Sequence, residues 1–300
     1  MRPPLASQLV EFGRTIRLTH SLFALPFALG AALLAEPPCP DGWSLALLAA
    51  CMVAARTAAM GMNRVADASL DARNPRTADR AIPAGRLSRR TALVLTILSG
   101  AAFIGLAWLF IPLRQNRWPG LLAPVFLVVL VGYSWTKRLT WLTHWTLGLA
   151  LGLSPVGVWI ALRGDVSAVP VLIGAGVLFW TAGFDILYAL QDAEVDRREG
   201  LHSAGAKYGR TRAHALAAAS HLATVALLLA AILYDNRAGG AAVLGWASLL
   251  ALAVIALALL VRHVLARGAD AEKIADSFFR ANVLVSMIWL AGVVVDVVRG

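Results

Sequence analysis

Apolar runs long enough to cross a bilayer recur along almost the whole chain, separated by short polar connections. About 20 apolar residues in a helix span the roughly 30 Å hydrocarbon core. The pattern predicts nine transmembrane helices, at 18–36, 43–62, 91–113, 120–135, 141–163, 168–189, 213–234, 239–261 and 279–297. We therefore expect an all-α, polytopic membrane protein.

Composition agrees with this class. Hydrophobic residues make up 59% of the chain and charged residues only 15%, with a mean hydropathy of +0.71. Soluble domains carry roughly 25% charged residues. The first apolar run lacks a small-residue cleavage site, so it is expected to be a retained span and not a signal peptide. No Gly/Ser-rich or Pro-rich linker interrupts the chain, which predicts a single integral-membrane domain over residues 1–300.

The basic residues predict the orientation of the spans. With a cytoplasmic N-terminus, 21 of the 27 lysines and arginines fall in cytoplasmic segments, 5 fall on the opposite side, and Arg56 remains inside a predicted helix. This is the asymmetry of the positive-inside rule. It explains the formal charge of +10 without nucleic-acid binding, for which the basic residues have no soluble domain. The expected location is the cell inner membrane, as a multi-pass protein.

Polar side chains at four-residue spacing continue two of the apolar runs at their cytoplasmic ends. The two sets, named here the first and second ladders, are Asn63, Asp67, Asp71 and Tyr188, Asp192, Asp196. Residues four apart lie on one face of a helix, so each set predicts a polar stripe. Asp185 lies one turn further into the second predicted helix.

Clustered carboxylates at membrane depth need a compensating charge. Mg²⁺ provides it well, because it takes oxygen ligands, usually one or two carboxylates together with substrate phosphates. Two aspartate stripes that face one another would hold Mg²⁺ against a diphosphate, and nearby arginines would bind its other oxygens. The alternative is that these side chains are solvated helix ends. A repeated motif followed each time by arginines favours the metal–diphosphate interpretation.

Three further cations could serve the same site. Lys137 and Arg138 follow the fourth predicted helix and are candidate phosphate contacts, although adjacent cations at a helix end are also ordinary topology markers. Arg56 precedes Asn63 by two turns on nearly the same face, roughly 10 Å deeper at 1.5 Å per residue. Its expected partner is an anionic group on a second substrate, such as an aromatic carboxylate; a structural pair with another helix is the alternative. The histidines His144, His214, His221 and His263 show no metal-ligand spacing with an acidic partner and receive no role.

These motifs together resemble the UbiA superfamily of intramembrane prenyltransferases. The first is similar to the family's first aspartate-rich motif and runs Asn63-x-x-x-Asp67-x-x-x-Asp71, then Asn74, Arg76, Thr77, Arg80 and Pro83. The second resembles the family's second motif and runs Asp185-x-x-Tyr188-x-x-x-Asp192-x-x-x-Asp196, then Gly200 and Ser203. The resemblance covers nearly the whole chain.

The resemblance implies a nine-helix bundle around a central cavity, with a polar cap and an active site that face the cytoplasm. It implies that the cavity opens toward membrane lipid to admit an isoprenoid tail. Matching positions in the family bind Mg²⁺ and diphosphate (Asn63, Asp67, Asp71, Asp192, Asp196) or contact the phosphates (Arg76, Arg80, Lys137). We add Arg138 and Tyr188 to the diphosphate-binding candidates. Arg56 and Ser154 match positions that approach the aromatic acid in hydroxybenzoate-using members.

The segments RLTHSLFALPFALG and ARTAAMGMNR look closest to the bacterial hydroxybenzoate polyprenyltransferase-like branch. The expected reaction is transfer of a polyprenyl group from its diphosphate to 4-hydroxybenzoate or a related aromatic acid in quinone biosynthesis. Prenylation of 1,4-dihydroxy-6-naphthoate in the futalosine route to menaquinone is an alternative, since both acceptors carry a carboxylate. The run Gln191-Asp192-Ala193-Glu194 is less acidic than in some ubiquinone-pathway members, which leaves the acceptor open.

The expected mechanism is electrophilic aromatic substitution by an allylic cation, with Asp67, Asp71, Asp192 and Asp196 as the catalytic carboxylates. Asp192 is the candidate to stabilise the cation or remove the ring proton. Two other classes remain as alternatives. An ion transporter also keeps carboxylates in a helical bundle, but arginines beside them would repel a cation. A lipid-binding scaffold would have no use for the paired motifs.

Overall fold

The computed structural model describes residues 4–16, 23–237, 243–266 and 271–299. Within these ranges the chain is helical and contains no strand. Eight helices of the described chain are long and apolar enough to span a membrane: Gly42–Asp71, Arg89–Arg114, Trp118–Thr136, Thr143–Arg163, Ala168–Arg198, Ala204–Asn236, Trp246–Leu265 and Ala281–Arg299. The all-α, multi-pass prediction is thereby confirmed.

The first predicted span differs from the others. The apolar run 18–36 yields a helix only over Leu25–Ala35 (α2), and residues 18–22 lie outside the described part. An 11-residue helix is about 16 Å long at 1.5 Å per residue, roughly half of the hydrocarbon thickness. The predicted count of nine is therefore approximate, with eight spans and one shorter apolar helix among the described residues.

The chain forms two compact units, Met1–Ser21 with Trp43–Leu139, and Leu22–Gly42 with Thr140–Gly300. The expected single domain over residues 1–300 stays a prediction. The first unit contains α1 (Leu5–Ile16), α3 (Gly42–Asp71), α4 (Arg89–Trp108), α5 (Phe110–Arg114) and α6 (Trp118–Thr136).

The start of α4 shows why the polar loop of the first unit stays close to α1. Ser88 caps α4, because its Oγ accepts from the Thr91 N–H at 3.0 Å. The Gln8 side chain of α1 accepts the Ser88 N–H at 3.1 Å. Below these bonds Phe12 and Ile16 of α1 pack with Val65, Ala81, Leu87 and Ala92. The end of the loop that follows the first ladder is thus held against α1.

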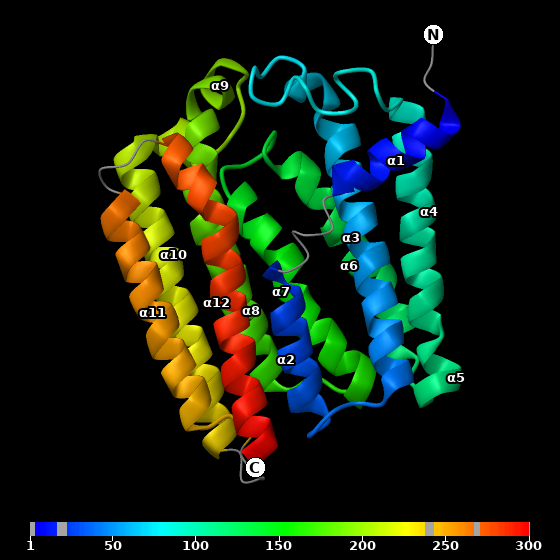
Figure 1. Cartoon of the computed structure of the whole chain (residues 1–300), viewed down its shortest axis with the longest axis vertical. Helices are drawn as coiled ribbons and strands as arrows, with labels where there is room; N and C mark the ends of the chain where they lie inside the picture. The colour runs from blue at the N-terminus through cyan, green and yellow to red at the C-terminus, as the bar shows by residue number, and fades with distance from the viewer. Residues whose placement is uncertain (1–3, 17–22, 238–242, 267–270, 300) are drawn as a thin grey trace. The chain divides into compact units, whose positions relative to one another are not determined.

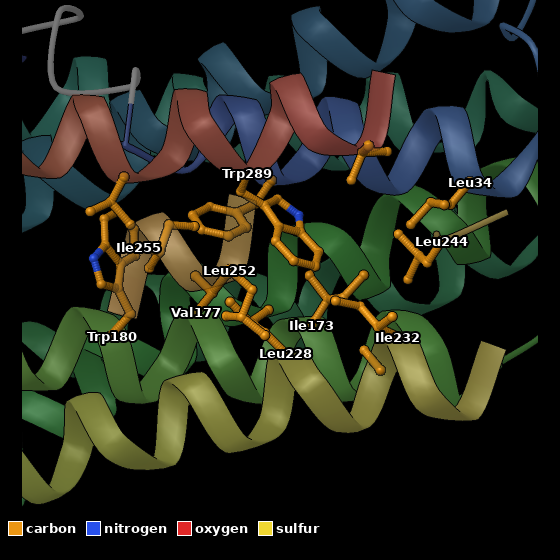
Figure 2. Packing of buried hydrophobic residues seen from close by; sticks show 14 of the residues in the cluster. Leu34, Ile173, Val177, Trp180, Leu228, Ile232, Leu244, Leu252, Ile255 and Trp289 are labelled. Atoms are coloured by element: carbon orange, nitrogen blue, oxygen red, sulfur yellow. The ribbon is translucent and has the colours of Figure 1, made fainter. Parts of the chain in front are cut away.

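The second unit contains α2 and the helices α7 (Thr143–Arg163), α8 (Ala168–Ala189), α9 (Ala193–Arg198), α10 (Ala204–Arg237), α11 (Trp246–Ala266) and α12 (Ala271–Arg299). Within this unit α8 packs on α7 and α10, and α12 packs on α2 and α11 (Figure 1). Its core contains a large apolar cluster, and Figure 2 shows Trp180 and Trp289 among the aliphatic side chains of this cluster. The Phe27 ring lies 5.2 Å from Trp180 and 6.3 Å from Trp289 between ring centroids.

Small residues bring α7 and α8 into backbone contact. A Cβ atom added to Gly148 would overlap the Leu178 carbonyl, and one added to Gly152 would overlap the Gly174 carbonyl. Apolar side chains gain little free energy by leaving lipid for another helix, so close van der Waals packing of this kind stabilises the association of membrane helices. The consequence for function lies one turn earlier on the same stripe, where α7 carries His144.

Candidate active site

The first ladder lies on the last two turns of α3, which ends at Asp71. Asn63 Nδ2 donates to Asp67 Oδ2 at 3.0 Å, so neighbouring rungs are linked. Asn63 and Asp67 are half-buried, whereas Asp71 is buried. The four-residue spacing therefore acts as expected on a regular helix and stacks an amide on a carboxylate.

Two arginines predicted as phosphate contacts lie on the carboxylates of this ladder. Arg80 Nη1 donates to both oxygens of Asp71, at 2.7 and 2.8 Å. Arg138 Nη2 donates to Asp67 Oδ1 at 3.2 Å and to the Ala66 carbonyl. Each carboxylate of the first ladder is thus charge-compensated by the chain itself. Both arginine side chains remain about one-third exposed, at 31% and 33%.

The loop after the first ladder is ordered by short polar contacts. Thr77 is buried and donates its hydroxyl to the Asp71 carbonyl at 3.1 Å. Asn74 Oδ1 accepts the Arg76 N–H at 3.0 Å, the bond that defines an Asx turn. Arg76 itself is exposed, as expected of a group that meets a ligand from the solvent side.

Arg86 connects the end of this loop to its neighbours at the surface. Its Nη1 donates to Asp79 Oδ1 at 2.9 Å, and this hydrogen bond raises the pKa of the Arg86 guanidinium. Its Nε donates to Glu11 of α1 at 3.4 Å. Asp79 lies eight residues after Asp71, but it faces solvent and pairs away from the ladder.

The remaining candidates of the first unit are half-buried. Lys137 follows the last residue of α6, and Arg56 lies on α3 two turns before Asn63. The assignment of Lys137 to phosphate and of Arg56 to the acceptor carboxylate stays a prediction.

The second ladder departs from the expected regular stripe. α8 ends at Ala189, residues Leu190–Asp192 form a turn of 3₁₀-helix, and α9 begins at Ala193. The prediction of an unbroken α-helical face through Tyr188, Asp192 and Asp196 is wrong in this respect, because a 3₁₀ turn winds at 3.0 residues per turn instead of 3.6. Asp192 and Asp196 are nevertheless both buried, at 8% and 2% exposed, and Tyr188 is half-buried.

The arginines after the second ladder pair locally. Arg197 Nη1 and Arg198 Nη2 contact the Glu194 carboxylate at 2.9 and 3.1 Å, and all three side chains are more than half exposed. Exposed pairs of this kind contribute about 0–1 kcal/mol. They leave Asp192 and Asp196 as the buried carboxylates of this motif.

A buried histidine joins the second motif without any signal in the local sequence. His144 Nδ1 lies 2.7 Å from Asp185 Oδ2, and the Ala204 N–H donates to His144 Nε2 at 3.2 Å. The three residues come from α7, α8 and the start of α10. The sequence assigned no role to His144, because its carboxylate partner lies 41 residues away and meets it only through helix packing.

Ser154, the second acceptor-binding candidate, has a structural bond in α7. Pro155 has no N–H, so the Leu151 carbonyl loses the donor that position 155 would supply. Ser154 Oγ donates to this carbonyl at 2.8 Å. The hydroxyl oxygen can still accept a hydrogen bond, so its assignment to the aromatic acid stays a prediction.

The chemistry of the donors fits a hard divalent cation. The ladders offer carboxylate and amide oxygens, and three of their carboxylates are buried, Asp71, Asp192 and Asp196. Oxygen is the ligand that Mg²⁺ takes. Within the described residues, no group of three or more His, Cys, Asp or Glu side chains is arranged to hold a metal ion. Mg²⁺ sites are commonly completed by substrate phosphates and water, so few protein ligands are needed.

Comparison with known proteins identifies a matching family and similar sequences. The family model described as "UbiA prenyltransferase family" matches residues 24–284. A 4-hydroxybenzoate octaprenyltransferase from Photobacterium profundum is 32% identical over 204 residues, 68% of each chain. A 4-hydroxybenzoate solanesyltransferase from a Synechocystis species is 27% identical over 292 residues, 97% of this chain and 95% of that one.

Solved structures show the same fold. An apo UbiA homologue from Aeropyrum pernix superposes with a TM-score of 0.79 at 33% identity, over 93% of this chain and 98% of that one. A UbiA homologue from Archaeoglobus fulgidus, bound to GPP and Mg²⁺, superposes with a TM-score of 0.65 at 18% identity, over 94% and 99% of the two chains.

Proposed function

The chain belongs to the UbiA prenyltransferase family, and from this premise we propose that it transfers a polyprenyl group from a prenyl diphosphate to 4-hydroxybenzoate or a related aromatic acid. The observation that carries the proposal is the pair of aspartate ladders, each with buried carboxylates at the end of an apolar helix. The names of the relatives support the hydroxybenzoate acceptor, since both act on 4-hydroxybenzoate.

We assign the diphosphate and its cation to the ladders. Asp67, Asp71, Asp192 and Asp196 would hold Mg²⁺, and when bound the ion would neutralise charge on the departing diphosphate. The Archaeoglobus fulgidus homologue with GPP and Mg²⁺ supports this choice of ion. Asn63 and Tyr188 would contact the diphosphate oxygens through their amide and phenol groups.

Basic residues would bind the negatively charged leaving group. Arg76 is exposed beside the ordered loop, and Arg80 and Arg138 keep about a third of their side chains accessible while they pair with the ladder. A guanidinium has five donors, so Arg80 and Arg138 can bind a carboxylate and a phosphate oxygen together. Lys137 would act as a further point charge.

The bond changes follow from these assignments. The C–O bond between the prenyl group and the diphosphate breaks, and the electron pair leaves with the diphosphate. The ring carbon next to the phenolic hydroxyl attacks the allylic cation, forms the C–C bond and loses its proton to a carboxylate, for which we propose Asp192. A site that excludes water would favour this sequence, because water would otherwise capture the cation.

The acceptor would be oriented by its carboxylate. Arg56 is half-buried within a span, where a bound aromatic acid would provide a counter-ion at low dielectric. We assign Ser154 to the same acid as a second polar contact. The multi-pass chain would present this site to the cytoplasmic face of the inner membrane, so that the lipid product stays in the bilayer and serves quinone synthesis.

One assay tests the proposal. Purified protein in detergent or nanodiscs is incubated with Mg²⁺, a polyprenyl diphosphate and either 4-hydroxybenzoate or 1,4-dihydroxy-6-naphthoate. We expect diphosphate release coupled to prenylated hydroxybenzoate. Product formed only from the naphthoate would identify the naphthoate as the acceptor in place of 4-hydroxybenzoate. The absence of product from any aromatic acid would overturn the proposed function.

A further inference from the structure

A hydrogen-bonded chain of three groups ends on the innermost carboxylate of the second motif. The Ala204 N–H donates to His144 Nε2 at 3.2 Å, and His144 Nδ1 lies 2.7 Å from Asp185 Oδ2. His144 is 2% exposed, whereas the Asp185 side chain keeps 25% of its area accessible. The histidine of this hydrogen-bonded series is therefore buried, and the carboxylate at its end is accessible.

The partners of His144 determine where its proton lies. A backbone N–H can only donate, so Nε2 must accept and carries no hydrogen. The neutral imidazole then has its hydrogen on Nδ1, and this hydrogen points at the carboxylate of Asp185. Asp185 consequently receives a short hydrogen bond to one oxygen, which fixes the plane of its carboxylate.

The bond to Ala204 also belongs to the start of α10. The first N–H groups of a helix have no intrahelical acceptor. Ser203 Oγ accepts the Ala206 N–H at 3.2 Å, and His144 Nε2 accepts that of Ala204. α10 therefore holds the imidazole from the side opposite to Asp185.

Packing prevents the imidazole from turning away. Gly148 and Gly152 bring α7 against α8 directly below His144. Ile186 and Leu187, which follow Asp185, are fully buried, and Trp145 packs against their cluster. The hydrogen bond thus lies in an apolar surrounding, where a polar group that lost its partner would be costly.

The second oxygen of Asp185 is available to a ligand. Its Oδ1 has no hydrogen bond to any residue in the described part of the chain. Asp185 lies three residues before Tyr188 and seven before Asp192. A fixed, accessible acceptor at this position in the motif is what a site needs to orient a substrate group.

We propose that His144 is a positioning residue, which holds the Asp185 carboxylate in one orientation so that Oδ1 serves the prenyl-transfer site. This inference rests on the proposed function, which it extends by two residues outside both ladders, His144 and Asp185. His144 acts only through Asp185 and touches no substrate.

The variants are chosen to separate positioning from packing. H144L removes both hydrogen bonds and replaces the imidazole by an apolar side chain of similar size. H144Q keeps a donor and an acceptor on one planar head, so it can still donate to Asp185 and accept from Ala204. D185N keeps the shape of the carboxylate without its charge. H221L is the control, because His221 is also 2% exposed in the same unit but bonds to His263.

Prenyl transfer is measured as kcat/KM, together with the melting temperature of each variant. We expect H144L to lose roughly 10–100-fold, the usual cost of removing a group that orients a functional ligand, and H144Q to stay within about threefold of the wild type. H144L should cost less than about threefold when D185N is already present, because a residue that acts through another has no further effect once its partner is disabled. Independent, multiplicative losses, no rescue by H144Q, or an equal loss in H221L would overturn the proposal.

A second readout does not require turnover. Selective ¹⁵N labelling of histidine reports which ring nitrogen is protonated, and the H144Q spectrum identifies the His144 signals. We expect Nδ1 protonated and Nε2 unprotonated; the opposite tautomer would overturn the inference even in an active protein. A wild-type chain with no turnover would instead overturn the proposed function, while the tautomer would still be determined.

Discussion

The Arg80 guanidinium places a single nitrogen, Nη1, between both carboxylate oxygens of Asp71, at 2.7 and 2.8 Å. The carboxylate is the more deeply placed partner, with 9% of its side-chain area exposed against 31% for the arginine. Asp71 therefore depends on Arg80 for charge compensation within the first unit, and Arg80 retains accessible donors.

This relationship predicts a rescue. R80M should lower the free energy of unfolding by about 1–3 kcal/mol, because a buried carboxylate would lose a charged hydrogen-bond partner. R80M/D71N should recover most of that loss, since the amide is neutral, while turnover stays abolished in both. Denaturation in detergent and prenyl transfer measure the two effects separately. A double variant that is less stable than R80M would show that the pair does not compensate charge.

The ladder carboxylates are expected to be essential for turnover. D67A and D192A should abolish prenyl transfer while the proteins still insert and fold, because the proposed diphosphate site loses a ligand. D79N and E194Q are matched controls in the same two segments, since Asp79 and Glu194 are exposed at 95% and 62% of their side-chain area. Both controls should stay within about threefold of the wild type. Near-normal activity in D67A or D192A would remove the argument for the ladders.

Cation dependence follows from the same donors. EDTA should eliminate turnover, and added Mg²⁺ should restore it, because oxygen ligands bind this ion reversibly. The melting temperature supplies a readout without chemistry: prenyl diphosphate should raise it in the presence of Mg²⁺ and not in EDTA. Equal stabilisation in both conditions would assign diphosphate binding to the basic residues alone.

The sequence predicted the spans well and the contacts between them poorly. Span positions depend on the length of apolar runs, which bilayer thickness sets locally, and the bounds of α6, α7 and α8 lie close to those expected. Of the first predicted run, 18–36, the described part is helical over the 11 residues Leu25–Ala35. Propensity over a short apolar run does not determine where a helix begins.

Site residues were predictable to the extent that they repeat along one helix. The first ladder keeps its spacing on α3, but the second passes through a 3₁₀ turn at Leu190–Asp192, which no four-residue pattern reveals. The partner of His144 depends on the close approach of α7 and α8. The glycines that allow this approach can be read in the sequence, but the sequence does not show which helix they contact. The pairing of Arg80 and Arg138 with aspartates, in place of phosphate alone, likewise required the folded chain.

Arg56 is expected to recognise the acceptor and not the prenyl donor. R56A should raise the KM for 4-hydroxybenzoate by roughly 10–100-fold, the loss of about 1.5–3 kcal/mol from a charged hydrogen bond. The KM for the prenyl diphosphate should change by less than about threefold. R114A is the control, since Arg114 is another arginine of the first unit and donates to Ser44 at 2.7 Å. An equal change in both KM values would assign Arg56 a structural role.

Ser154 has a hydrogen bond within α7 and a proposed role at the acceptor, and substitutions can separate the two. S154A leaves the Leu151 carbonyl without the hydroxyl that donates to it at 2.8 Å, which should cost about 1 kcal/mol of stability. In S154A/P155A, residue 155 again has an N–H for this carbonyl, so the double variant should regain the melting temperature. If Ser154 also binds the aromatic acid, the raised acceptor KM of S154A should persist in the double variant, because a restored backbone bond does not replace the hydroxyl. A KM that recovers together with the melting temperature would confine Ser154 to the helix.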